Sequence, residues 1–234
     1  MRRPGLDVRH ASIELVPPDV PAALAAVPAD RRAVLVPLLL ASGYHDRVDL
    51  PAAIRATRPG TAHAAVLGPD PLLAVALADR LAAAGWCAGE AVVLAAAGSS
   101  DPDAVGSVYR QAGLLAAELT YRSDPPAGPD SLPYPDGAGG TVSGSPRPAP
   151  AEPPVQVAVG FGSAAKPDVR AAVAALRTAG ARRVAIAPYL LAPGHFADRL
   201  AHAGADRVAA PLGAHPAVVE LILRRADTAP APRR

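Results

Sequence analysis

Cysteine, lysine and aromatic residues are all scarce in this sequence of 234 residues. The only cysteine, Cys87, excludes a disulfide framework and a thiolate metal cluster, since both need several thiols. It follows Trp86 at the end of an apolar helical pattern, so we expect a buried thiol. Aromatics make up 3% of the chain and hydrophobic residues 50%. The core must therefore be packed with Ala, Val and Leu.

Long hydrophobic runs and runs of one charge are also lacking. The net charge is +2, and the aromatics are not interleaved with arginine, so the sequence gives no support for nucleic-acid binding. The longest apolar run, Ala33 to Ala41, is too short to span a membrane. Arg2-Arg3 is followed by Pro4-Gly5 rather than an apolar segment, which argues against a twin-arginine signal. We therefore expect a cytoplasmic protein.

Residues 123–154 differ in composition from the rest of the chain. They hold ten of the 28 prolines and five glycines, with no apolar periodicity. Such a stretch buries too little surface to offset the entropy lost on ordering. We expect a flexible insertion there.

Outside this insertion, apolar strands alternate with Ala/Leu-rich helices. We expect strands at 8–15, 34–41, 63–67, 91–96, 155–159 and 184–187. Helices are expected at 20–27, near Pro51, at 70–84 with Asp70 as N-cap, and at 103–119. Strands that are apolar on both faces predict an α/β fold with parallel sheets covered by helices on each side.

The sequence repeats itself. Leu6-Asp-Val and Pro18-Asp-Val resemble Val155-Gln-Val and Pro167-Asp-Val. Pro37-Leu-Leu-Leu-Ala-Ser-Gly resembles Pro188-Tyr-Leu-Leu-Ala-Pro-Gly, and Leu67-Gly-Pro-Asp-Pro resembles Leu212-Gly-Ala-His-Pro. Three matches in the same order indicate a duplication. We expect two similar lobes with a cleft between them, at 1–88 and 89–234.

The first copy lacks a counterpart to one strand of the second. Strand 91–96 and its loop precede Val155, but only five residues precede Leu6. The first lobe would then keep three strands and a bare sheet edge.

Ligand sites of open α/β sheets lie at the carboxyl ends of the strands. There, Glu14 follows the first expected strand and His45 the second. Carboxylate and imidazole suit Fe(II), Co(II) and Ni(II), and either group could accept a proton.

The segment Val36-Pro-Leu-Leu-Leu-Ala-Ser-Gly-Tyr-His-Asp-Arg-Val-Asp-Leu-Pro51 resembles the signature loop of the sirohydrochlorin chelatases, the type II tetrapyrrole chelatases. Ile13-Glu-Leu-Val-Pro-Pro18 resembles their second signature, and the segments 188–199 and 211–216 resemble their two-domain members. The resemblance implies insertion of a divalent metal, Fe or Co, into sirohydrochlorin or a related tetrapyrrole in siroheme or cobalamin synthesis. It implies that the metal is a substrate and that no organic cofactor is used.

The resemblance also assigns roles to residues. It implies that His45 and Glu14 hold the metal and take part in catalysis. A further family ligand, a His in an Ala-His-Gly-Ser loop after the first strand, has no position in these 234 residues. In the second copy, Ala97, Ser163 and Phe196 occupy the three ligand positions, so each chain has at most one site.

The remaining polar residues of the signature loop are candidates for substrate contacts. Arg47 either binds a substrate carboxylate or pairs with Asp46 or Asp49, and we expect Tyr44 and Ser42 beside it at the substrate. Arg199 is a further candidate for the substrate carboxylates. His195 aligns with Tyr44 rather than with His45, so we do not expect a primary ligand there. His215 opens a helix and is expected to be structural, while no constellation supports His10, His63 or His202.

Two alternatives follow from the absent histidine. The chain could be a non-catalytic module that binds metal or tetrapyrrole without inserting the ion. Alternatively, the start of the gene is misassigned and the cellular protein is a complete enzyme.

Overall fold

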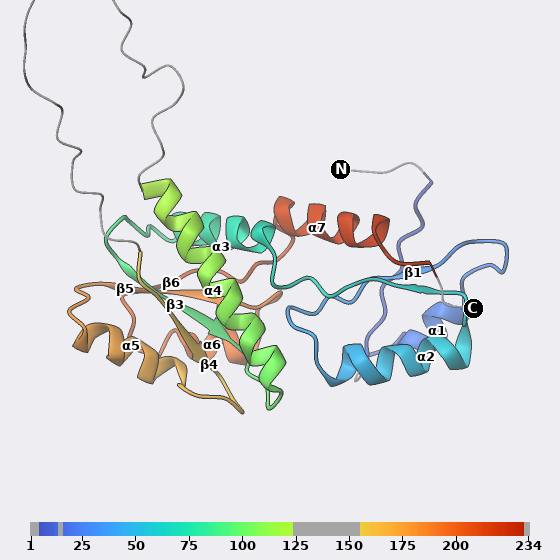
Figure 1. Cartoon of the computed structure of the whole chain (residues 1–234), viewed down its shortest axis with the longest axis horizontal. Helices are drawn as coiled ribbons and strands as arrows, with labels where there is room; N and C mark the ends of the chain where they lie inside the picture. Colours follow the sequence, from blue (N-terminus) through green and yellow to red (C-terminus); the bar gives the residue numbers. More distant parts are fainter. Residues whose placement is uncertain (1–4, 14–15, 124–154, 232–234) are drawn as a thin grey trace, which may run out of the picture.

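The computed structural model describes residues 5–13, 16–123 and 155–231. Nearly all of the predicted insertion therefore lies outside the described residues. The described part is elongated, with one parallel sheet near each end (Figure 1). Within it lie α1 (Val20–Ala25), β1 (Val34–Leu35), the π-helical turn η1 (His45–Asp49), α2 (Leu50–Thr57), β2 (Ala62–His63), α3 (Pro71–Ala83), β3 (Ala91–Ala96), α4 (Pro102–Ser123), β4 (Val157–Phe161), α5 (Val169–Thr178), β5 (Val184–Tyr189), α6 (His195–Leu200), β6 (Arg207–Val208) and α7 (Pro216–Asp227).

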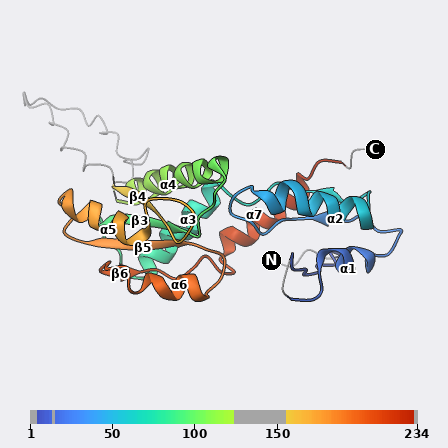
Figure 2. The same ribbon diagram turned by 90° about the horizontal axis from the view of Figure 1, so that it is seen from below.

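The C-terminal half contains a four-stranded parallel sheet in the order β4-β3-β5-β6. Strand β3 pairs on both edges, and every residue of β3 and β5 is buried. Helices α3, α4 and α7 pack on one face around Leu94 and Phe161. Helices α5 and α6 pack on the other face around Val93 and Ile186 (Figure 2). The predicted α/β fold with covered parallel strands is confirmed.

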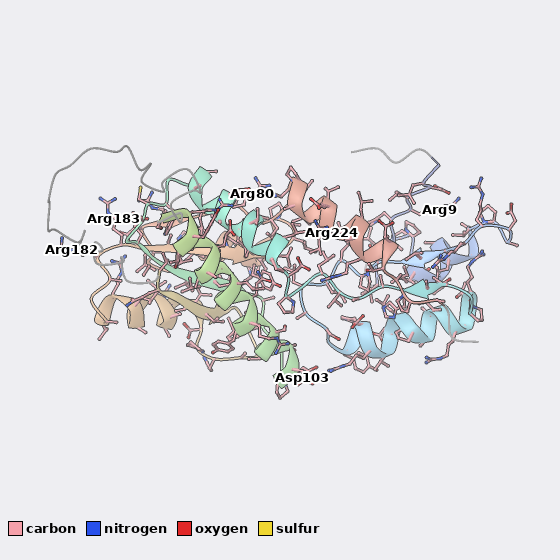
Figure 3. All side chains as sticks on the ribbon, turned by 45° about the horizontal axis from the view of Figure 1, so that its top comes forward. Arg9, Arg80, Asp103, Arg182, Arg183 and Arg224 are labelled. Carbon is pink, nitrogen blue, oxygen red and sulfur yellow. The ribbon has the colours of Figure 1, made fainter. Side chains whose placement is uncertain are left out.

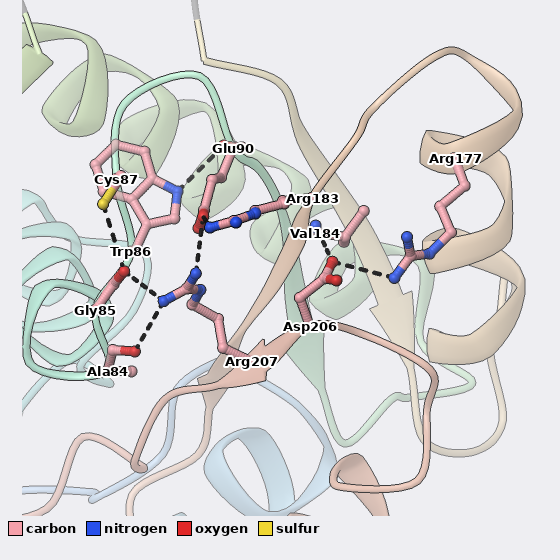
Figure 4. A network of polar contacts seen from close by, with 10 residues as sticks. All are labelled: Ala84, Gly85, Trp86, Cys87, Glu90, Arg177, Arg183, Val184, Asp206 and Arg207. Carbon is pink, nitrogen blue, oxygen red and sulfur yellow. Dashed lines mark hydrogen bonds and ion pairs between the residues drawn. The ribbon is translucent and has the colours of Figure 1, made fainter.

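A polar network closes this sheet at the amino ends of its strands (Figure 4). The buried carboxylate of Glu90 lies 2.9 Å from Arg207 Nη2 and 3.5 Å from Arg183 Nη1. Asp206 accepts a hydrogen bond of 2.7 Å from Val184 N–H and pairs with Arg177 at 3.1 Å. These contacts tie the loop before β6 to the strand beside it.

The N-terminal half has a much smaller sheet, in which β1 pairs only with β2. Helices α1 and α2 enclose a cluster of four buried residues, Val20, Leu24, Leu50 and Ile54. Residues 8–13 form no strand apart from a bridge between Ser12 and Asp19.

The predicted strand at 8–15 is therefore wrong over 8–13, and 14–15 lie outside the described residues. The strands at 34–41 and 63–67 are likewise much shorter than predicted. A strand exists only where a neighbour takes up its backbone N–H and C=O groups. In the described residues, β1 has a neighbour on one edge only.

The predicted duplication is visible in matching contacts. The isolated bridge Ser12–Asp19 matches Phe161–Asp168, and each aspartate caps the helix that follows it, accepting from Ala22 N–H or Ala171 N–H. The pairing of β1 with β2 also has the register of the pairing of β5 with β6. Val34 lies opposite Ala62 as Ala185 lies opposite Arg207. The two copies therefore share a backbone plan.

Each copy also sends its last helix toward the other. Helix α3 packs mainly on α4, β5 and α7 of the C-terminal half, and Arg80 donates to Leu212 O at 2.9 Å. From α7, Arg225 donates to Leu67 O at 3.0 Å, and Ala229 packs on Ala62 of the N-terminal half. The division at residue 88 remains a proposal, because the lobes interlock through these helices.

Two smaller observations complete the fold. Cys87 is exposed, so the prediction of a buried thiol is wrong: the helix ends before it, and its side chain points away from the core. Among the described residues, no helix is long and apolar enough to cross a membrane.

Candidate functional site

His45 lies at the carboxyl end of the N-terminal sheet, where the sequence predicts it. The chain leaves β1, runs through residues 36–44, and enters η1 at His45. We call residues 36–45 the site loop. Its end is held by Arg47 N–H, which donates to Gly43 O at 3.0 Å. The turn continues into α2, where Pro51 stands in the first turn and Leu50 and Ile54 point into the core.

The imidazole of His45 is oriented by a carboxylate one turn further on. His45 Nδ1 lies 2.6 Å from Asp49 Oδ2. The ring is 45% exposed, and Nε2 makes no hydrogen bond to another described residue. A carboxylate on Nδ1 places the ring proton there and leaves the lone pair of Nε2 free. This is the arrangement of a histidine that ligates a metal through Nε2.

Asp46 joins the site loop to the neighbouring strand. Its Oδ2 accepts a hydrogen bond of 2.6 Å from Ser42 Oγ, and its Oδ1 lies 3.2 Å from His63 Nε2. The geometry of the second contact does not satisfy hydrogen bonding, so it is an ion pair when His63 is protonated. Ser42 therefore braces the loop through Asp46.

Arg47 reaches across to the C-terminal half. Its guanidinium pairs with Asp101, the residue before α4, and lies 3.7 Å from Asp103 in the first turn of α4. Figure 3 labels Asp103 at this end of α4. The alternative that Arg47 pairs with Asp46 or Asp49 is wrong, because those carboxylates are taken by His63 and His45. Asp101 and Asp103, on either side of the start of α4, compete with any substrate carboxylate for this arginine.

Tyr44 and Glu14 complete the predicted set. The Tyr44 side chain is exposed and meets the His45 ring edge to face, with centroids 6.4 Å apart. Glu14 lies outside the described residues. Among the described residues, no three His, Cys, Asp or Glu side chains come together to hold a metal. His45 is thus the member of the predicted ligand pair whose position the structure describes.

The corresponding place in the C-terminal half is filled by close packing. Ser163 Oγ donates to Ala97 O at 3.0 Å, and the backbone of Ser163 leaves no room for a side chain at Gly98. The ring of Phe196 lies so close to Gly162 that a Cβ there would sit 1.9 Å from it. Ala97 and Ser163 remain exposed here, and Phe196 lines a pocket together with Arg199 and His202.

The other histidines lie in different surroundings. His215 caps α7 by accepting from Ala217 N–H and lies 3.0 Å from Asp79, which is a structural role. His195 is exposed at the start of α6. The statement that His63 lacks a constellation is wrong, since it faces Asp46.

Sequence reasoning missed two members of the site. The i,i+4 spacing of His45 and Asp49 on a helical turn was a usable signal for their contact. His63 could have been found by its place at the end of the strand beside β1, since neighbouring parallel strands end at one edge.

The fold and this corner define a class of protein: a duplicated α/β protein with His45 at one corner and Phe196 at the matching position of the other half. A model of the CbiX family matches residues 1–84 and 150–229. These ranges include more than half of the chain, so the chain belongs to the CbiX family. No curated protein matches the chain.

Solved structures agree with this fold. SirB from Bacillus subtilis with Fe3+ aligns with a TM-score of 0.69 and 21% identity, covering 93% of this chain and 79% of SirB. The sirohydrochlorin chelatase SirB from Bacillus subtilis subspecies spizizenii, in complex with cobalt, aligns with a TM-score of 0.62 and 19% identity, covering 93% and 78%.

A larger relative is the multi-domain DR2241 from Deinococcus radiodurans, with structural similarity to chelatases. It aligns with a TM-score of 0.50 and 19% identity, covering 82% of this chain and 40% of its own. At these identities the likeness shows the fold.

Proposed function

We propose that this chain inserts Fe(II) or Co(II) into sirohydrochlorin or a related tetrapyrrole, with His45 as a metal ligand. The observation that carries the proposal is the pair between His45 Nδ1 and Asp49, which leaves Nε2 free on an exposed ring. The metal complexes of SirB support the choice of ions. Glu14 is proposed as the second ligand on the resemblance alone.

The reaction exchanges one metal ion for two pyrrole protons. The metal must leave its ligands for the macrocycle, so a site with few ligands and open positions suits it better than a closed one. As the ion leaves, Nε2 of His45 regains a lone pair beside the pyrrole protons and can accept one of them, while the second passes to the carboxylate of Glu14 and from there to water. The Asp49 carboxylate stabilises the imidazolium that forms.

Arg47 and the exposed ring of Tyr44 are proposed to contact the substrate, with Ser42 bracing the loop between them. A substrate carboxylate would replace Asp101 and Asp103 as partner of Arg47, exchanging one exposed ion pair for another. Exposed pairs differ by only about 1 kcal/mol, so this exchange is not costly. A cytoplasmic location likewise remains a prediction.

The alternative is a module that binds metal or tetrapyrrole without inserting the ion. The observation that favours it is that no three potential metal ligands converge among the described residues. We expect the 234-residue chain to bind Co(II) weakly and to insert it slowly or not at all.

A matched set of variants tests the proposal. Fusing a strand that ends in Ala-His-Gly-Ser to the N-terminus should strengthen Co(II) binding and speed insertion, followed by absorbance as cobalt enters sirohydrochlorin. In this fusion, His45→Ala should abolish insertion, because the metal loses its described ligand. His195→Ala is the control and should retain most activity. Loss of activity in the control with retention in His45→Ala would overturn the site assignment.

A fusion that binds Co(II) tightly through His45 and still leaves sirohydrochlorin unchanged would instead favour the binding module. Isothermal titration with Co(II) separates these two outcomes from a simple failure to bind.

A further inference from the structure

A tyrosine of the C-terminal half touches the backbone of the site loop. Tyr189 is the last residue of β5 and is 3% exposed. Its hydroxyl donates a hydrogen bond of 2.9 Å to Leu40 O. Leu40 lies two residues before Ser42 and five before His45. The contact therefore joins the end of one sheet to the loop that carries the proposed ligand.

The approach of Tyr189 depends on a glycine. A Cβ at Gly68 would lie 2.0 Å from the Tyr189 hydroxyl oxygen and 2.3 Å from Leu40 O. The segment after β2, the site loop and the tyrosine thus meet at one point with no room for a methyl group. Leu67 N–H also donates to Leu39 O at 2.8 Å, so two successive carbonyls of the loop are held.

The surroundings of this contact are rigid. Asp70, two residues beyond Gly68, pairs with Arg225 at 3.0 Å, and its N–H donates to the fully buried Gln111 at 2.9 Å. Burial, together with the nearby Asp70 carboxylate, raises the pKa of Tyr189 well above its ordinary value. The hydroxyl therefore keeps its proton and remains a donor at neutral pH.

The contact is not part of the plan that the two copies share. The repeat aligns Pro188-Tyr189 with Pro37-Leu38, and Leu38 is exposed and carries no donor. The glycine equivalent to Gly68 is Gly213, where an added Cβ would meet only Arg80 and Pro211 O at distances above 3 Å. In the C-terminal half, the matching carbonyls Leu190 O and Leu191 O accept from Leu212 N–H and Gly213 N–H, each at 2.9 Å. In the loop that leads to His45, the Tyr189 hydroxyl takes the place of the second backbone donor.

We propose that Tyr189 is a positioning residue that fixes the site loop, and through it the place of His45, from the opposite half of the molecule. It acts through Leu40 and does not touch the metal or the tetrapyrrole. Part of this inference rests on the proposed function, because the value of a fixed His45 lies in metal delivery. The fixing of the loop itself can be measured without either substrate.

The first test is hydrogen exchange by mass spectrometry on the full chain, comparing Tyr189→Phe with wild type. The variant keeps the ring but removes the donor to Leu40. The amide of Leu67, which donates to Leu39 O of the site loop, should exchange about tenfold faster. The amides of β3 should not change, because local opening is separate from global unfolding. Tyr121→Phe is the control, since Tyr121 is exposed, and it should change neither region.

Unchanged exchange at Leu67 would overturn the inference, and so would an equal rise throughout the chain, which would indicate a general stabilising role. If Tyr189→Phe does not fold, Gly68→Ala decides: it retains the hydroxyl but places a methyl group against both oxygens. The same local increase in exchange is expected in Gly68→Ala. Its absence in a folded Gly68→Ala would contradict the positioning role of Tyr189.

The second test uses cobalt insertion by the fusion described above. A misplaced His45 should raise the KM for Co(II) about tenfold and leave the KM for sirohydrochlorin within about twofold. Equal changes in both constants would overturn the positioning role. If the parent fusion inserts no cobalt, the proposed function fails. The exchange experiment still tests whether the bond between Tyr189 and Leu40 fixes the site loop.

Discussion

The two halves of this chain share one backbone plan, but they differ in how much apolar surface they bury. The C-terminal half buries β3 and β5 completely between two layers of helices. The N-terminal half encloses four buried residues between α1 and α2 beside a two-stranded sheet. Burial of apolar area is the main stabilising term of a fold, so the second half supplies most of the stability.

The distribution of polar chemistry is the reverse. The well-packed half has Ala97, Ser163 and Phe196 at its loop ends, where Ser163 donates to Ala97 O and Phe196 packs on Gly162. The smaller half carries His45, Asp46 and Asp49 on an exposed turn. Under the proposed function, one copy serves as a support while the other carries the metal ligand His45. The contacts of Tyr189, Arg225 and Arg47 are the means by which the support reaches the site.

The largest expected effect on stability comes from replacing one core leucine in each half with alanine. Leu94→Ala in β3 leaves a cavity in a layer that is held on both faces, so we expect a loss of about 4 kcal/mol. Leu24→Ala in α1 lies in a small cluster that can collapse around the gap, and we expect about 2 kcal/mol. Urea unfolding followed by circular dichroism measures both.

Equal losses for the two leucines would contradict the unequal division of the core. Leu38→Ala is the control, because this leucine is exposed and should change the midpoint little.

A smaller effect is expected from Asp206, and it should depend on pH. Its hydrogen bond from Val184 N–H, aided by Arg177, lowers the pKa of the carboxyl. A lowered pKa in the folded protein stabilises it above the ordinary value near pH 4, and this contribution is lost as the pH falls through the lowered pKa. Asp206→Asn should therefore cost about 1 kcal/mol at pH 7, since the carboxylate is partly exposed, and less at pH 3.

Urea midpoints of wild type and Asp206→Asn at the two pH values check this. A difference that stays constant from pH 7 to pH 3 would show that the charge of Asp206 is not what stabilises the loop before β6.

The sequence predicts well what local chemistry decides. Strand β3 was predicted at its observed bounds, because a fully apolar run is favoured as a buried strand wherever its neighbours are. Helix α3 was predicted with its Asp70 cap, because capping and an N-terminal proline are local. His45 was placed at a loop end after a strand for the same reason.

What the sequence does not predict depends on partners far along the chain. The strand at 8–15 fails because strand formation requires a neighbour, and the pattern of apolar residues does not say whether one is present. The partner of Arg47 lies 54 residues away, and that of Tyr189 lies 149 residues away. Spacing within a motif carries no information about such contacts. The partners that hold Arg47 and the site loop are therefore visible only in the structure.

The smallest expected effect concerns the residue that stands in the N-terminal half where Asp206 stands in the other. Thr61 precedes β2 as Asp206 precedes β6, and it is 4% exposed. Its hydroxyl has no hydrogen-bond partner among the described residues. A buried hydroxyl without a partner costs its desolvation, so replacing it with a methyl group of the same shape removes a cost rather than a contact. Thr61→Val should leave the N-terminal half as stable or raise the free energy of unfolding by up to about 1 kcal/mol.

The matched change in the other half, Asp206→Val, should lower the free energy of unfolding, because Val184 N–H then loses its acceptor. Urea midpoints at pH 7 decide between them. A destabilised Thr61→Val would mean that its hydroxyl has a partner such as an ordered water, and that the two halves hold their last strands in more similar ways than their contacts indicate.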